Sequence, residues 1–171
     1  MKNLIPRLLC LTVVLWANSA TSFGQASAAK KTRDLKTLIN QYAANTIRTL
    51  NAQDAKYGGF KYSVSDKNIF NADMNGDGEF DAVVEIFFCE TGNCHPTTKF
   101  SELVVFLNKN GKYQFVASKG FRLYGKINSI ADGVIRIDVY DLDEGDPQCC
   151  PELKRIEFYS LRGNRLTKVR K

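Results

Sequence analysis

The chain has 171 residues, of which 44% are hydrophobic and 25% are charged, and its formal net charge is +6. This balance excludes a disordered chain, because disorder requires low hydrophobicity and a high net charge. The basic residues form no dense stripe with aromatic side chains, so we expect no nucleic-acid partner.

Residues 1–28 have the pattern of a secretory signal peptide. Lys2 and Arg7 lie at the start of an apolar run, Leu8 to Ala17, that is too short to cross a bilayer as a helix. We predict cleavage after the triplet Ala26-Ser27-Ala28, with cleavage after Ser19 or Ala20 as alternatives. The protein is therefore expected to be exported, either to the periplasm or as a secreted protein.

No later segment approaches the roughly 20 apolar residues of a membrane-spanning helix, so we expect no transmembrane segment in the mature chain. Cys10 lies inside the apolar run rather than at a cleavage point, which argues against a lipid anchor. The mature chain is expected to form one domain.

An N-terminal helical segment is predicted over residues 29–58. Apolar residues recur there at steps of three and four, which places them on one face of a helix. Thr32 or Asp34 can cap its start, and Gly58-Gly59 ends the region. We expect the apolar face, from Leu35 to Leu50, to pack against a sheet.

A β domain is predicted over residues 59–171, where the apolar period changes to two. The dipeptides Asn110-Gly111 and Asp132-Gly133 are typical of type I′ hairpin turns, and Gly163-Asn164 is a weaker version. The expected strands lie near 60–64, 81–88, 101–108, 112–117, 123–131, 134–141, 155–161 and 165–169. We therefore predict a mainly β (α+β) fold, with the helix packed on a curved antiparallel sheet or open barrel of about eight strands.

The segment from Asp73 to Asp81, the acidic loop, is rich in oxygen-bearing side chains. Calcium binds about six to eight oxygens, which alternate residues of a tight loop can supply. Val84 stands where an EF-hand has its last Glu, so the loop is instead similar to strand-flanked D-x-N-x-D-G-x-x-D loops of extracellular β proteins. We expect either a structural calcium site or a metal-free turn held by side-chain hydrogen bonds. The predicted calcium ligands are Asp73, Asn75, Asp77, Glu79 and Asp81.

Four cysteines lie beyond the predicted signal, and an even number in an exported protein favours disulfides. Cys89 and Cys94 bracket a segment that can fold back at Gly92, so we prefer their pairing, which leaves Cys149 and Cys150 as a vicinal pair. The alternative joins the 89–94 segment to the 149–150 segment. These thiols could instead bind zinc or copper(I) together with His95, although their spacing matches no zinc motif.

Part of the chain, residues 60–161, resembles a group of small exported bacterial proteins. The matching stretches are the acidic loop with the strand after it, the turn at 132–135, and Asp146-Pro147-Gln148-Cys149-Cys150-Pro151. The mycobacterial lipoproteins called LppP/LprE look like distant members of this group. The resemblance implies export, a β fold and a special role for Cys149-Cys150, and it implies no activity. The chain departs from the pattern by having Cys89 and Cys94 and by lacking a lipobox.

The sequence holds no G-x-S-x-G elbow and no Gly-rich phosphate loop, and its single histidine rules out H-E-x-x-H. We therefore expect a non-enzymatic exported module that binds an unknown envelope component or protein, with calcium as its one possible cofactor. The alternative is an extracytoplasmic redox or metal-handling protein that uses Cys149-Cys150. A hydrolase would have to use the acidic run at 141–146, which a solvated loop explains more simply.

Overall fold

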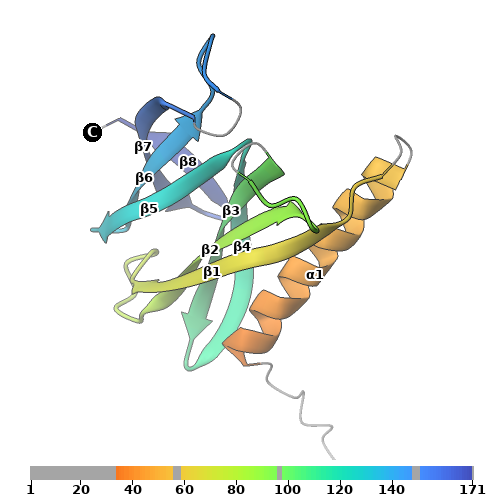
Figure 1. Cartoon of the computed structure of the whole chain (residues 1–171). Coiled ribbons are helices and arrows are strands. Elements are labelled where there is room, and N and C mark those ends of the chain that lie inside the picture. Colours follow the sequence, from red (N-terminus) through yellow and green to blue (C-terminus); the bar gives the residue numbers. More distant parts are fainter. Residues whose placement is uncertain (1–33, 56–58, 96–97, 148–150, 171) are drawn as a thin grey trace, which may run out of the picture. The chain divides into compact units, whose positions relative to one another are not determined.

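The computed structural model describes residues 34–55, 59–95, 98–147 and 151–170 (Figure 1). The predicted signal peptide at 1–28, Gly58 and the Cys149-Cys150 pair lie outside the described residues. Within the described ranges, no helix has the length and apolar character that a bilayer span requires.

The helix α1 runs from Leu35 to Asp54, inside the predicted helical segment. The Asp34 carboxylate accepts the backbone N–H of Thr37 at 2.6 Å, which satisfies one of the free donors at the helix start. Asp34, one of the two residues predicted to cap the helix, is therefore its N-cap. The buried residues Ile39 and Ala43 belong to the predicted apolar face.

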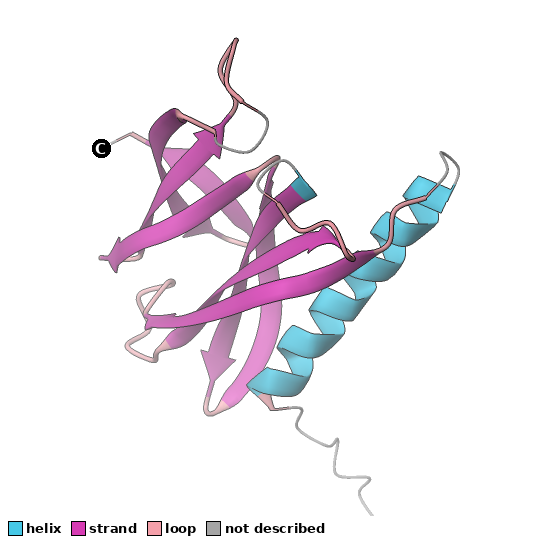
Figure 2. Cartoon of the chain, in the orientation of Figure 1, coloured by secondary structure: helices cyan, strands magenta, loops and turns pink. Residues whose placement is uncertain are grey.

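The described part of the chain has eight strands, and every neighbouring pair is antiparallel. They form two four-stranded sheets, β1-β2-β3-β4 and β5-β6-β7-β8, which we name the first and second sheets (Figure 2). This confirms a mainly β fold with about eight strands. The strands are β1 (Tyr62–Ala72), β2 (Asp81–Glu90), β3 (Lys99–Lys109), β4 (Lys112–Phe121), β5 (Tyr124–Ala131), β6 (Val134–Asp141), β7 (Leu153–Arg162) and β8 (Arg165–Val169).

Both predicted type I′ turns are present. Asn110 and Gly111 have φ angles of 53° and 76°, and Asp132 and Gly133 have φ angles of 51° and 67°. Positive φ at both central residues is the requirement of that turn, and it explains the residue types. At the third turn only Gly163 has positive φ, so this hairpin uses a different turn geometry.

The first sheet is the middle layer, because both of its faces are buried. Ala82, Val84 and Phe88 of β2 belong to a core cluster with Ile39 and other residues of α1. The intervening residue Val83 belongs to a second cluster with residues of the second sheet. Figure 1 shows α1 lying along the first sheet.

Two buried polar side chains of the first sheet reach the edge of the second. Ser101 Oγ accepts the N–H of Gly125 at 2.7 Å and donates to its carbonyl at 3.2 Å. The Glu85 carboxylate accepts the N–H of Ile127 at 2.6 Å. Strand β5 is the terminal strand of its sheet, so these contacts occupy backbone groups that an open edge would leave available for pairing.

Candidate functional site

The acidic loop folds around the side chain of its first residue. The Asp73 carboxylate accepts the backbone N–H groups of Asn75, Gly76 and Gly78, at 3.3, 2.7 and 2.9 Å. These hydrogen bonds favour the ionised form, with the one from Gly78 contributing most, so the pKa of Asp73 is lowered. Gly76 and Gly78 have φ angles of 80° and 84°, which allow the chain to turn tightly around the carboxylate.

The middle of the loop continues the same pattern. Asn75 Oδ1 accepts the N–H of Asp77 at 3.0 Å, and Asp77 Oδ1 accepts the N–H of Glu79 at 2.8 Å. The Glu79 carboxylate leaves the loop and accepts the N–H of Asn110, in the turn between β3 and β4, at 2.9 Å. Glu79 therefore ties the loop to a neighbouring hairpin.

Asp81 anchors the other end of the loop and is completely buried. Its two carboxylate oxygens accept the N–H groups of Met74 at 2.9 Å and Asn108 at 2.8 Å. Burial raises the pKa of Asp81, and the negative charges of Asp77 and Asp73 raise it further. The pKa of Asp81 is therefore raised chiefly because the side chain is removed from water, and only secondarily because two other carboxylates lie nearby.

The structure does not gather the side chains of all five predicted calcium ligands, because the Glu79 carboxylate reaches Asn110 and Asp81 is the buried first residue of β2. Among the described residues, no Lys or Arg forms a salt bridge with them, and no group of three or more His, Cys, Asp or Glu side chains is arranged to hold a metal. Each carboxylate oxygen has more than one lone pair, so the hydrogen bonds do not use up its capacity. Calcium binding stays a prediction, as does the metal-free turn.

A cleft of about 650 Å³, the acidic-loop cleft, lies between this loop and the turn that joins β5 to β6. A Cβ placed on Gly133 would lie 3.6 Å from the carbonyl oxygens of Asp73 and Met74, so the two segments approach closely. Phe80 lines the cleft and is 68% exposed. Other residues lining the cleft are Asp73, Asn75, Ile130, Asp132 and Leu161.

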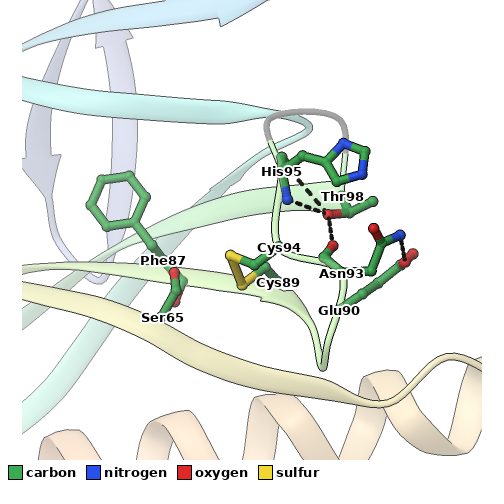
Figure 3. The surroundings of a disulfide bond; sticks show 8 residues. All are labelled: Ser65, Phe87, Cys89, Glu90, Asn93, Cys94, His95 and Thr98. Atoms are coloured by element: carbon green, nitrogen blue, oxygen red, sulfur yellow. Dashed lines mark hydrogen bonds between the residues drawn. A yellow bond between two sulfur atoms is a disulfide. The ribbon is translucent and has the colours of Figure 1, made fainter. Parts of the chain in front are cut away.

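Cys89 and Cys94 form a disulfide, with their Cα atoms 5.2 Å apart (Figure 3). The segment between them turns back, with a β-bridge between Glu90 and Asn93 and a φ of 83° at Gly92. The preferred pairing is confirmed. The alternative that joins this segment to Cys149 and Cys150 is excluded for Cys89 and Cys94, because both sulfurs are already bonded.

The remaining sequence-predicted cysteines, Cys149 and Cys150, lie outside the described residues. His95 is exposed and follows the disulfide directly, and its N–H donates to Thr98 Oγ1 at 3.0 Å. In the acidic run, Asp141 pairs with Arg155, and the Asp146 carboxylate accepts the N–H groups of Asp143 and Glu152. Asp141 and Asp146 therefore stabilise the loop and its flanking strands.

Three buried carboxylates, those of Glu85, Asp138 and Glu157, were not predicted from the sequence. Burial raises the pKa of Glu85, whose other oxygen accepts Asn68 Nδ2 at 2.9 Å. Burial also acts to raise the pKa of Glu157, but hydrogen bonds from Lys168, Tyr159 and Arg155 lower it to about 2. The available signal was an acidic residue at an otherwise apolar strand position, such as Glu85 between Val84 and Ile86.

Comparisons with protein-family models, with curated proteins and with solved structures found no match. The resemblance to small exported bacterial proteins therefore stays a prediction. The fold and the site define a sandwich of one helix and two antiparallel sheets, with a cleft beside an acidic loop.

Proposed function

We propose that this chain is an exported, non-catalytic β module that binds an envelope component or a protein partner at the acidic-loop cleft. The observation that carries the proposal is Phe80, an aromatic side chain that is 68% exposed beside the carboxylates of the acidic loop. An exposed aromatic group in a concave site with a few polar groups is typical of a binding surface. The signal-like residues 1–28 support export.

Cell-wall sacculi and vesicles of zwitterionic lipid are suitable defined probes for the binding test, because the acidic loop would repel anionic vesicles. We expect the mature protein to sediment with one of them, and Phe80→Ser to reduce the bound fraction. Phe60→Ser is the matched control, because Phe60 is 61% exposed and precedes β1, whereas Phe80 lies in the acidic loop directly before β2 and lines the cleft. Absence of binding to both probes, or an equal loss in both variants, would overturn the proposed function.

We also propose that calcium stabilises the acidic loop. The concentration of Asp73, Asp77 and Asp81, without a salt-bridged cation among the described residues, supports a positively charged ligand. Calcium is expected to raise the melting temperature of the wild type but not of Asp77→Asn. Glu144→Gln, which removes one negative charge from a different loop, is the control and should respond as the wild type does. An unchanged melting temperature up to millimolar calcium would leave the metal-free turn as the correct interpretation.

A second candidate is an extracytoplasmic redox or metal-handling role for Cys149-Cys150. It is favoured by the Cys89–Cys94 disulfide, which leaves these two cysteines as the remaining pair beyond the predicted signal. Vicinal disulfides are strained and easier to reduce than ordinary ones. Mild reduction followed by thiol labelling and mass spectrometry should modify Cys149 and Cys150 first. Two bridges that are equally hard to reduce would exclude this role.

Export is tested by the intact mass of the native protein. The expected mass corresponds to a chain that begins at Ala29, or after Ser19 or Ala20, with its disulfides formed. A chain recovered from the cytoplasm that begins at Met1 with every thiol free would contradict the proposal.

A further inference from the structure

A second cleft, of about 400 Å³, lies between the two sheets and is separate from the acidic-loop cleft. We name it the inter-sheet cleft. Its lining includes Phe87 of β2, Lys99 of β3, and Tyr124 and Lys126 of β5, and β1 supplies polar residues. It therefore combines aromatic surface with two ammonium groups.

Phe87 is unusual for its position in the fold. Every other residue of β2 from Asp81 to Cys89 is buried, whereas Phe87 is only partly buried. On the same face, Val83 belongs to the core between the sheets, and Glu85 contacts the edge of β5. The second sheet therefore covers this face of β2 at Val83 and Glu85 but not fully at Phe87. The ring of Phe87 lines the inter-sheet cleft.

The ammonium groups of the two lysines make no direct ion pair. Within the part of the chain that the structure describes, neither the Lys99 nor the Lys126 side chain forms a hydrogen bond or a salt bridge. The buried Glu85 carboxylate lies close enough to Lys126 to interact with its charge. Asp66 is the acidic residue among the described residues of the lining, and its carboxylate accepts the N–H of Lys67 at 2.8 Å. Two lysines and one aspartate therefore give the lining itself a net positive charge, which attracts anions, although Glu85 behind it offsets part of this charge.

The backbone of β1 departs from regular strand geometry beside the inter-sheet cleft. Its pairing with β2 shifts between Val64 and Asp66, which is a β-bulge at Ser65. The Ser65 hydroxyl donates to the carbonyl of Phe87 at 3.3 Å, and Figure 3 shows both residues beside the disulfide. Bulges redirect side chains and are frequent next to functional sites.

We propose that the inter-sheet cleft binds a small organic anion. Its flat ring lies against Phe87 and Tyr124, and its carboxylate or phosphate group pairs with Lys99 and Lys126. The volume lies within the range of small-molecule sites, which is about 300–1,000 Å³. This site shares no lining residue with the acidic-loop cleft, so its test is independent of the proposed function.

The test compares three naphthalene probes by titration calorimetry: 2-naphthoate, 2-naphthyl phosphate and the neutral 2-naphthylmethanol. One of the two anions is expected to bind roughly fivefold more tightly than the alcohol, since an ion pair at a partly exposed site contributes modestly. The two anions distinguish a carboxylate ligand from a phosphate ligand. Inorganic phosphate alone should bind weakly, because it has no ring to contact the aromatic walls.

Variants give the sign of each charge's contribution. Lys126→Gln and Lys99→Gln should each weaken binding of the anion roughly fivefold and leave binding of the alcohol unchanged. Asp66→Asn should tighten binding of the anion, because this substitution removes a negative charge that repels it. Lys67→Gln is the control, since the Lys67 ammonium donates to Asn40 of α1, on the other face of the first sheet. Phe80→Ser should also have no effect.

Three results would overturn the inference. One is the absence of saturable binding of either anion below about 10 mM, which is weaker than a specific site of this size provides. Another is equal affinity for the anions and the alcohol. The third is a loss in Lys126→Gln and Lys99→Gln no larger than in Lys67→Gln.

Discussion

Gly125 occupies a position where the packing leaves no room for a side chain. A Cβ built there would lie 3.0 Å from Ile137 Cγ2 and 3.0 Å from the ring of Phe121. Both neighbours belong to the core between the sheets, so they cannot move without disturbing it. The backbone of Gly125 also bonds with Ser101, which holds β5 in place.

Gly125→Ala is therefore expected to destabilise the protein by about 1–3 kcal/mol, the usual cost of overpacking a core. Gly120→Ala is the matched control in β4, because a Cβ there would meet only Glu102 Oε1, at 4.0 Å. Urea unfolding gives both free energies. A loss in Gly125→Ala no larger than in Gly120→Ala would show that the core adapts.

Glu157 predicts a pH dependence at the residue scale. Its pKa is lowered from 4.5 to about 2, so its ionised form is favoured in the folded state. The resulting stability is fully present above about pH 4.5 and is lost as the pH falls toward 2. Lys168 and Arg155 are about half exposed, so solvent screens part of their attraction to Glu157. We therefore expect the lowered pKa to add on the order of 2 kcal/mol to the free energy of unfolding.

Glu157→Gln should remove this part of the acid dependence. The measurement is the free energy of unfolding in urea between pH 6 and pH 2, compared with Glu144→Gln in an exposed loop. The wild type and Glu144→Gln should lose stability in parallel, and the curve of Glu157→Gln should be flatter. Identical slopes in all three proteins would contradict the assigned contribution.

At the scale of elements, the hairpin that carries the disulfide gives a prediction of its own. The disulfide between Cys89 and Cys94 closes a short loop. By lowering the entropy of the unfolded chain, a loop of this length raises the free energy of unfolding by about 2 kcal/mol. The paired change Cys89→Ala with Cys94→Ser should reduce stability by that amount, measured by urea unfolding. Because β2 and β3 remain paired from Ala82 to Cys89, the far-ultraviolet circular dichroism should stay native. A variant as stable as the wild type would show that the hairpin is fixed without the bond.

Elements with regular patterns were predictable from the sequence. Strand β6 has the predicted limits, and α1 shows the predicted cap and buried face, because alternation and helical spacing are unbroken there. Strand β1 is longer than the predicted 60–64, since its polar residues around the bulge at Ser65 hide the alternation. The acidic loop was found from its residue types, but its role in forming a cleft depends on a distant turn.

The division into two sheets could not be predicted in the same way. Strands β4 and β5 are separated only by Arg122 and Leu123, a link as short as a hairpin turn, yet they belong to different sheets. Local patterns give strand positions and turn types, whereas the choice of neighbour depends on contacts between distant residues. Both clefts lie where such distant segments meet, so the sequence alone gave no sign of either.

At the scale of the whole molecule, the two sheets are held together by their shared apolar core and by a few polar contacts. Ser101→Ala would remove only the hydroxyl group and leave the N–H and carbonyl of Gly125 without their partner. The expected loss is about 2 kcal/mol, because unsatisfied buried groups are costly. Local opening should then affect the second sheet most, because Gly125 belongs to β5, the terminal strand of that sheet.

Native-state hydrogen exchange measures this directly. In Ser101→Ala, amides of β5 and β6 should lose more protection than amides of β2 and β3, which lie in the middle of the first sheet. Ser129→Ala, at an exposed position of β5, is the control and should leave the pattern unchanged. If protection fell equally in both sheets, the two would unfold as a single cooperative unit, and the Ser101 contact would contribute to global stability rather than to the docking of one sheet on the other.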